Sequence, residues 1–301
     1  MAIINRELLD GVCADMNNAF AKGGKAGTPV WAKIATRIPS TKASNIYNWL
    51  SGWPKLRQWV GAKVVQNLKG NGYIVENLDF EATVSIPRND IEDGYTVVYL
   101  PMMEQAGQNA QEFPDDLVFG AVNNAFTAPC FDGKPFICND HPVGDREESN
   151  MGTMRLSADS LDAADASIGA ARTAMRARKD AEGRSMNVTP TILMVGPMLE
   201  NVARNLLTLE RFKDGTPNPY KGSLELLVCN QIEDPDQWFL LDTSRVVKPF
   251  IFQPRKEPEM VPEGANSPNA FFLAEYLFSI EARGAGAFGF WQLIWGSTGK
   301  G

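Results

Sequence analysis

Residues 78–86 read LDFEATVSI, and this stretch decides the fold class. Apolar and polar side chains alternate along it without a break. Alternation with a period of two places all the apolar side chains on one face of a β-strand. The residues on that face are Leu78, Phe80, Ala82, Val84 and Ile86. The preceding GYIV at 72–75 also has strand character, so 72–87 is predicted to form an extended ribbon.

Helical patterns flank this ribbon on both sides. Residues 55–69 carry an apolar stripe at helical spacing and end at the glycines of GNG, which predicts an amphipathic helix. Residues 90–126 are helical as well. Pro114 is expected to divide that helix into two pieces, because proline lacks the N–H group that a helix interior uses.

The second half of the chain predicts one long helix over 157–179, with Ser157 or Ser160 as its cap, and then mostly strands. TPTILMVG at 189–196 reads as a buried strand that leads into a helix beginning at Pro197. Together the helices and antiparallel strands predict an α+β fold. Further strands are expected at 223–229, 237–243, 246–252, 275–283 and 287–295, with the Pro-rich stretch 254–268 and the glycines of 283–289 as breaks.

Composition excludes several classes of protein. The chain has 301 residues, of which 44% are hydrophobic and 22% charged, so a sizeable core is expected. The formal charge of −7 disfavours a sequence-specific DNA-binding protein. Four scattered cysteines indicate a reducing compartment without a disulfide framework. No signal peptide or membrane span is expected, and the glycine-lysine segment AKGGKAGTP at 21–29 predicts a flexible front end outside the core.

One stretch, CFDGKPFICNDHPV at 130–143, could carry chemistry. It contains Cys130, Cys138 and His141, the only histidine. A zinc site normally takes four ligands in tighter spacing, and a Cys–His nucleophile needs a thiolate held against its base. The alternative is a turn, because Asp-Gly and Asn-Asp are common turn residues. The spacing favours the turn, and we expect neither a catalytic nor a metal site.

Three other patterns have a functional and a structural interpretation. The acidic run NDIEDG at 89–94 lacks the ligand spacing of a calcium loop and fits a helix start. The glycines of 284–289 do not open a helix after a strand, as dinucleotide binding requires. The basic face of Arg172, Arg176 and Lys179 could lie against DNA phosphates or simply face solvent.

Many short segments, in order, resemble one protein family. They include the run from Trp49 to Gly94, PDDLVFGAVNNAF and FDGKPFICNDHPV between 114 and 143, NPYKGSLELLV at 218–228, QWFLLDTSRVVKPFIFQPRKEPE at 237–259, and ARGAGAFGFWQLIWGS at 282–297. On these segments the chain resembles the major head proteins of Mu-like tailed phages, from about residue 30 onward. The resemblance implies the Hong Kong 97-type capsid fold.

That fold sets expectations for the domains. We expect an N-terminal arm over 1–45, an E-loop region over 46–88, a peripheral domain with a spine helix over 89–185 and an axial domain over 186–245. Residues 246–301 would return to the peripheral domain.

The function implied is that of a non-catalytic capsid subunit without cofactors. Copies would form hexamers and pentamers of an icosahedral head that encloses double-stranded DNA, assembled in the host bacterial cytoplasm. A scaffolding protein and a portal protein are implied partners, a decoration protein is left open, and no membrane contact is expected. Because a lone ribbon cannot bury its apolar face, neighbouring subunits should cover it. The expected contact residues are Trp49, Trp53, Trp59, Leu78, Phe80 and Val84.

One rival function remains open on the sequence alone. A cytosolic hydrolase would use a Cys/His pair within residues 130–141. It requires the thiol and the imidazole to meet, whereas a capsid subunit does not.

Overall fold

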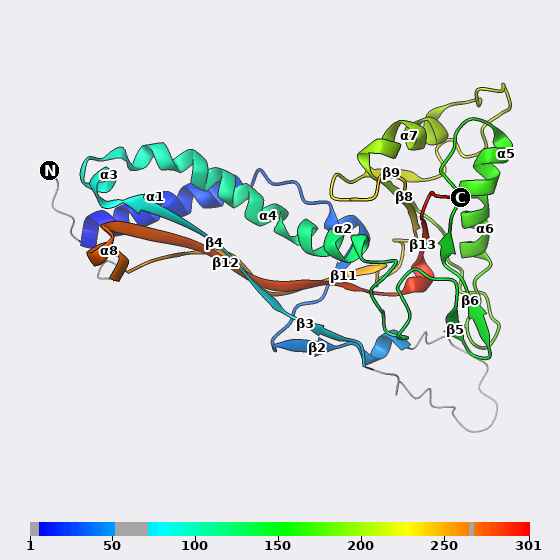
Figure 1. Ribbon diagram of the computed structural model, residues 1–301, viewed down its shortest axis with the longest axis horizontal. Coiled ribbons are helices and arrows are strands. Elements are labelled where there is room, and N and C mark those ends of the chain that lie inside the picture. Colours follow the sequence, from blue (N-terminus) through cyan, green and yellow to red (C-terminus); the bar gives the residue numbers. More distant parts are fainter. Residues whose placement is uncertain (1–5, 52–71, 265–267) are drawn as a thin grey trace.

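The computed structural model describes residues 6–51, 72–264 and 268–301. The molecule is elongated, with a long helix lying along a twisted sheet at one end and a second sheet with its own helices at the other (Figure 1). The helices are α1 (Arg6–Gly24), α2 (Trp31–Ile34), α3 (Arg88–Glu92), α4 (Leu100–Asn123), α5 (Leu161–Ala164), α6 (Ala170–Arg176), α7 (Glu200–Thr208) and α8 (Pro268–Phe272). Short 3-10 turns are η1 (Asn48–Ser51), η2 (Tyr95–Tyr99), η4 (Pro197–Leu199) and η5 (Trp291–Leu293), and η3 (Asp165–Gly169) is a π turn.

The long end is built on a four-stranded sheet in the order β1-β11-β12-β4. Its strands are β1 (Ala35–Arg37), β11 (Phe250–Pro262), β12 (Glu275–Phe288) and β4 (Leu78–Pro87). β12 pairs antiparallel with both β11 and β4, and β1 pairs parallel with β11. The strand predicted from LDFEATVSI is therefore confirmed as β4, which forms an edge of this sheet.

Helix α4 lies against the sheet because glycines allow a close approach. A Cβ atom on Gly286 would lie 1.9 Å from the carbonyl oxygen of Leu117 in α4. The glycines at 284–289 were predicted to bend the chain between two strands. That prediction is wrong, since β12 runs unbroken through Gly284 and Gly286, and their function is to remove side chains from the helix–sheet contact.

Helix α1 packs on α4 at the far end of the molecule. Its residues Leu9, Val12, Met16 and Ala19 are buried in a core shared with α4, β4 and β12. The prediction that the front of the chain lies outside the core is therefore wrong for α1. The surface that α1 packs on lies some eighty residues later in the chain, so the sequence near α1 does not reveal it.

Prolines in two elements, α4 and β11, behave differently from prediction. α4 continues through Pro114, and the helical region breaks instead at Gly94, which has a φ of 75°. β11 likewise runs through Pro254 and Pro258, with register shifts beside them where the ladder does not need their missing N–H groups. The Pro-rich stretch is therefore strand as far as Pro262 rather than a separator.

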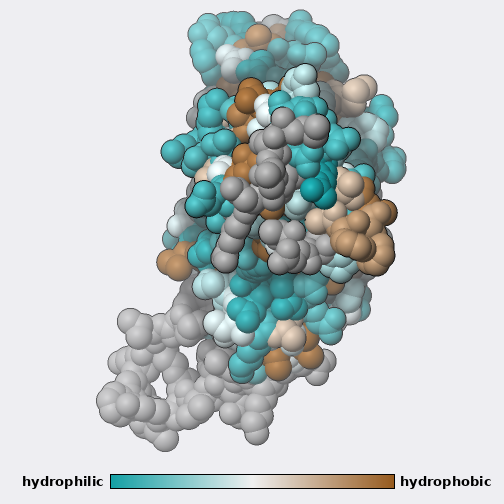
Figure 2. All heavy atoms as spheres, turned by 90° about the vertical axis from the view of Figure 1, so that its left-hand side faces the viewer, coloured by the Kyte–Doolittle hydropathy of each residue, from teal (hydrophilic) through white to brown (hydrophobic). Residues whose placement is uncertain are grey.

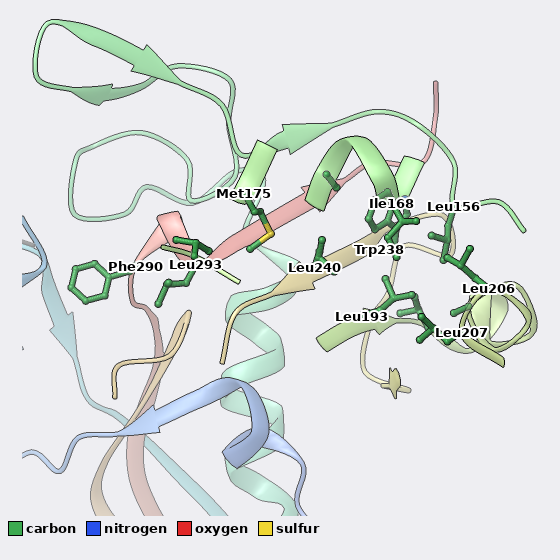
Figure 3. Packing of buried hydrophobic residues seen from close by; sticks show 14 of the residues in the cluster. Leu156, Ile168, Met175, Leu193, Leu206, Leu207, Trp238, Leu240, Phe290 and Leu293 are labelled. Carbon is green, nitrogen blue, oxygen red and sulfur yellow. The ribbon is translucent and has the colours of Figure 1, made fainter. Parts of the chain in front are cut away.

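The second end contains a five-stranded sheet in the order β7-β13-β10-β8-β9. The strands are β7 (Met151–Gly152), β13 (Ile294–Ser297), β10 (Trp238–Leu241), β8 (Ile192–Val195) and β9 (Glu225–Val228). All four residues of β8 and of β10 are buried. Figure 3 shows side chains of this core, such as Trp238 and Leu240, between the sheet and the neighbouring helices.

Predictions for this end are mostly confirmed. Ser160 caps α5 by accepting a hydrogen bond from the Ala163 N–H at 3.2 Å. The helix predicted over 157–179 is observed over 161–176 with a π turn inside it. The strand at 189–196 and the turn opened by Pro197 also lie where the sequence placed them.

A small hairpin sits beside the junction of the two ends. It consists of β2 (Ser44–Ile46) paired antiparallel with β3 (Ile74–Glu76). Buried hydrogen bonds fix it to the large sheet: Tyr47 Oη donates to Gln253 Oε1 at 2.5 Å, and Gln253 Nε2 donates to Asn77 Oδ1 at 2.8 Å. Gln253 is fully buried on β11. The remaining hairpin, β5 (His141–Val143) with β6 (Arg146–Glu148), follows the turn at 130–140.

None of the helices within the described ranges combines the length and the apolar character needed to cross a membrane.

Candidate functional site: subunit-contact surfaces

The apolar face of β4 is only partly covered by the rest of the chain. Ile86 is buried, but Leu78 keeps 58% of its surface exposed, and Phe80 and Val84 are half-buried. A groove of about 500 Å³ separates this face from α4. The side chains in it include Phe80, Ala82, Ala106, Ala110, Phe113 and Leu117. Phe80 and Phe113 meet edge to face across the groove, with ring centroids 4.8 Å apart.

The rim of this groove is acidic. Glu81 from β4 and Asp116 from α4 both line it. Glu112 lies one helical turn before Asp116, and burial together with this neighbouring charge raises the pKa of Asp116. A partner surface with apolar side chains and basic groups would complement such a groove.

A second apolar surface lies at the far end of the molecule. Short runs in η2 and α8 expose Val97 and Val98 to 68% and 66%, and Phe271 and Phe272 to 82% and 78%. Figure 2 looks at this end and shows hydrophobic atoms on its surface. Each run exposes neighbouring apolar side chains to solvent, which is typical of protein–protein contact sites. Sequence reasoning missed them, although the runs YTVVY and AFFL are visible in the sequence.

The hairpin β2–β3 contributes a third exposed apolar pair. Ile46 and Ile74 lie directly opposite each other across the two strands, and both are more than half exposed. Cross-strand apolar pairs normally pack against other side chains on the same face of a sheet. The exposed pair Ile46 and Ile74 is therefore a further candidate contact.

The predicted tryptophan anchors have different outcomes. Trp49 packs within its own chain, edge to face with Tyr47 at 5.9 Å and with Phe290 at 5.8 Å. Its ring is therefore largely used by the intramolecular core, and it is a weaker contact candidate than predicted. Trp53 and Trp59, and the helix predicted over 55–69, lie outside the described residues.

The three basic residues predicted to face DNA do not form one free surface. Arg172 donates to Ser223 Oγ at 2.8 Å and lies 5.7 Å from the ring centre of Tyr220. Burial, followed by repulsion from Arg176, lowers the pKa of its guanidinium. Arg176 and Lys179 are exposed. Only these two remain available for a phosphate contact.

The turn at 130–141 does not bring a thiol against the histidine in the way a nucleophile needs. The Cys130 thiol donates to Asp132 Oδ1 at 3.1 Å, and Asp132 Oδ2 lies 2.7 Å from His141 Nδ1. Burial, and then the Asp132 charge, strongly raise the pKa of Cys130. Burial also raises the pKa of Cys138 to about 11. Both thiols therefore stay protonated near neutral pH, which does not support a nucleophilic cysteine.

The long helix on a long sheet, joined to a second sheet, defines a class of protein: the Hong Kong 97-type capsid subunit. The procapsid of bacteriophage JBD30 matches with a TM-score of 0.61 and 27% identity, over 98% of this chain and 76% of that one. A JBD30 capsid decorated with minor capsid protein trimers matches at 0.62 and 26%, over 70% and 93%. A virus-like particle from Pyrococcus furiosus shares the fold at 0.54 with 13% identity, over 94% and 98%.

The sequence comparisons identify the family. Residues 9–164, 153–232 and 228–300 match the family described as Mu-like prophage major head subunit gpT. The major capsid protein of Escherichia phage Mu is 30% identical over 274 residues, which is 90% of this chain and 68% of that protein. The Mu-like prophage FluMu major head subunit of Haemophilus influenzae is 27% identical over the whole chain and 76% of its own length. The chain belongs to this family; it is a structural capsid protein and not an enzyme.

Proposed function

We propose that copies of this chain associate as hexamers and pentamers into a closed icosahedral head around double-stranded DNA. The observation that carries the proposal is the uncovered apolar groove between β4 and α4. When a neighbour covers such a surface, the assembly is stabilised by roughly 25 cal/mol per Å² of apolar area buried. A contact of standard size buries about 800 Å² on each partner, and a closed shell repeats it many times.

A segment of the neighbouring copy has the composition to cover this groove. Residues 52–71 contain no acidic residue in the sequence, and they carry the predicted anchors Trp53 and Trp59. The basic residues in the same segment complement the acidic rim formed by Glu81 and Asp116; they are Lys55, Arg57, Lys63 and Lys69. Phe80 in the groove would receive the apolar side chains, and Leu78 and Val84 extend the same face of β4 beside it.

The remaining partners follow from membership of the family. We propose that a scaffolding protein takes part in assembly in the host bacterial cytoplasm and that a portal protein occupies one vertex, with a decoration protein as an optional addition. Contact with packaged DNA would be weak and independent of sequence, because the chain is acidic overall and Arg172 is already engaged. Arg176 at the end of α6 and Lys179 just after it are the exposed cations of this group.

The test is a matched pair of substitutions on the two faces of β4. Leu78→Asp places a charge on the exposed apolar face, at a position that is 58% exposed and therefore tolerates the change in the isolated subunit. Ser85→Asp introduces the same group on the opposite, polar face of the same strand. Burying Leu78 would contribute about 1.5–3 kcal/mol per contact, and burying an aspartate costs more.

We expect Leu78→Asp to abolish shell formation and Ser85→Asp to leave it intact, as seen by electron microscopy and sedimentation of the purified proteins. Circular dichroism should show both variants folded. Shells formed equally well by both variants would rule out coverage of this face by a neighbour.

A further inference from the structure

The turn at 130–141 gathers three potential metal ligands that the sequence does not place together. The ligand atoms of Cys130, Asp132 and His141 all lie within 4.8 Å of one another. The histidine side chain is fully buried, Cys130 is 5% exposed, and the Asp132 side chain is 9% exposed. Sequence spacing suggested Cys138 as the companion of the other two, but its thiol interacts with Asp140 instead.

The side chains are held firmly in this arrangement. The imidazole stacks on the Trp291 indole at a centroid distance of 4.0 Å and an angle of 3°. Asp132 Oδ1 accepts a hydrogen bond from the Lys134 N–H at 3.0 Å, and Gly133 takes up the positive φ of 81° that the turn requires. Among the described residues, His141 Nε2 is buried without a hydrogen-bond partner. The nitrogen that faces Asp132 is Nδ1, so Nε2 lies outside the proposed set of ligand atoms.

The spacing suits a small tetrahedral cation. Zinc binds thiolate sulfur at about 2.3 Å and imidazole nitrogen or carboxylate oxygen at about 2.0–2.2 Å, so its ligand atoms lie roughly 3.5 Å from one another. Here sulfur and nitrogen stand 3.1 and 2.7 Å from the two oxygens of the same carboxylate. Small side-chain rotations would widen both distances once the thiol and the imidazole no longer share protons with Asp132.

Charge balance favours a divalent cation over any other occupant. Cys130 as thiolate and Asp132 as carboxylate carry two negative charges, and neutral His141 carries none. A divalent ion makes the buried site neutral overall, whereas a lone thiolate beside the carboxylate would be strongly disfavoured. Mixed sulfur, nitrogen and oxygen ligands suit zinc among the common divalent ions.

We propose that Cys130, Asp132 and His141 form a structural zinc site that closes the 130–141 turn on itself, while the His141 ring stacks on Trp291 of η5. On binding, the thiol loses its proton to solvent and the imidazole coordinates through Nδ1 with its proton on Nε2, so one proton is released per ion. A water molecule completes the tetrahedron. No electron transfer is involved. The site is independent of the surfaces that contact neighbouring subunits.

The test uses the full-length chain, stripped of metal by dialysis against a chelator and then titrated with Zn²⁺ or with Co²⁺ alone. We expect uptake of about one ion per chain, and a near-ultraviolet sulfur-to-cobalt absorption band that reports a bound thiolate. Zn²⁺ should raise the midpoint of thermal unfolding, and chelator should reverse the rise.

Two cysteine variants separate this site from other thiols. Cys130→Ser keeps a hydroxyl donor for Asp132 but should lose the cobalt band and weaken zinc binding by more than about 100-fold. Cys138→Ser removes a neighbouring buried thiol and should change neither. The proposal is overturned if the unsubstituted chain takes up no zinc at micromolar free metal, if its cobalt complex lacks the thiolate band, or if Cys138→Ser abolishes that band. The spectrum of the unsubstituted chain decides the question even if Cys130→Ser fails to fold.

Discussion

The contact between α1 and α4 depends on glycine, and two alanine substitutions in the same helix should therefore have opposite effects. A Cβ atom on Gly107 would lie 2.0 Å from the carbonyl oxygen of Phe20 in α1 and 2.8 Å from the carbonyl carbon. A Cβ atom on Gly120, further along α4, would meet nothing within 4 Å. Neither glycine has a positive φ, so alanine fits the backbone at both positions.

The magnitudes follow from these distances. Alanine is favoured over glycine inside a helix by about 0.5–1 kcal/mol, so Gly120→Ala should stabilise the subunit by that amount. Gly107→Ala gains the same helix propensity, but its new methyl group would overlap the carbonyl oxygen of Phe20. Because that oxygen belongs to the backbone, the whole of α1 must move away by about an ångström or more. That movement loosens Met16 and Met103, both fully buried in the distal core. Overpacking of this kind costs about 1–3 kcal/mol, and a rigid backbone obstacle places the cost at the upper end.

The assay is urea unfolding of unassembled subunits, followed by intrinsic tryptophan fluorescence. Because both variants gain the same propensity, we expect Gly107→Ala to be less stable than Gly120→Ala by about 2–3 kcal/mol. That difference corresponds to roughly 4–12 °C in the midpoint of thermal unfolding. Hydrogen exchange should show the loss first in α1. If Gly107→Ala proves as stable as Gly120→Ala, the close packing of α1 on α4 is not a property of this protein.

Two further predictions concern buried polar groups. Gln253→Leu should destabilise the subunit by about 2–4 kcal/mol in chemical denaturation, because Tyr47 and Asn77 would lose their buried partner; an unchanged midpoint would contradict this. Asp115 accepts bonds from the Val30 and Trp31 N–H groups, yet burial raises its pKa above the ordinary 3.8. The folded state therefore binds the Asp115 proton more tightly than the unfolded state does. The resulting contribution to the free energy of unfolding is complete below pH 3.8 and is lost as the pH rises through the raised pKa. Asp115→Asn should remove that decline from a plot of unfolding free energy against pH, and an identical plot for both proteins would refute the assignment.

Local patterns in the sequence predicted the elements whose side chains follow a simple period. The alternation of 78–86 identified β4, and the continuous apolar run ILMV identified β8 as a buried strand. Ser160 was recognisable as a cap because its partner N–H lies only three residues away. In each case the deciding interaction is close in sequence or depends on burial alone.

The features that the sequence did not reveal depend on contacts between residues that are far apart in the chain. Gly286 and Gly107 serve contacts with backbone atoms that are far away in sequence, so nothing local separates them from bend-forming or helix-weakening glycines. Pro114 was expected to divide the helix into two pieces, but α4 continues through it with the proline buried. Asp115, the residue after Pro114, accepts hydrogen bonds from the N–H groups of Val30 and Trp31 at the start of the distant α2.

The candidate surfaces were predictable in part. The apolar face of β4 followed from alternation, but its groove depends on how far α4 stands from Phe80, which only the fold determines. The exposed runs in η2 and α8 lack the periodicity that distinguishes a surface patch from a core segment. Asp132 joined Cys130 and His141 through a turn whose geometry the spacing of cysteines and histidine alone did not reveal.

Electron cryomicroscopy of particles assembled from the purified chain tests the central claim most directly, because it shows what covers the groove between β4 and α4. We expect closed shells in which side chains of an adjacent copy fill the space beside Phe80 and Phe113. Shells in which that groove is open to solvent, or preparations that contain only single chains at high concentration, would contradict it.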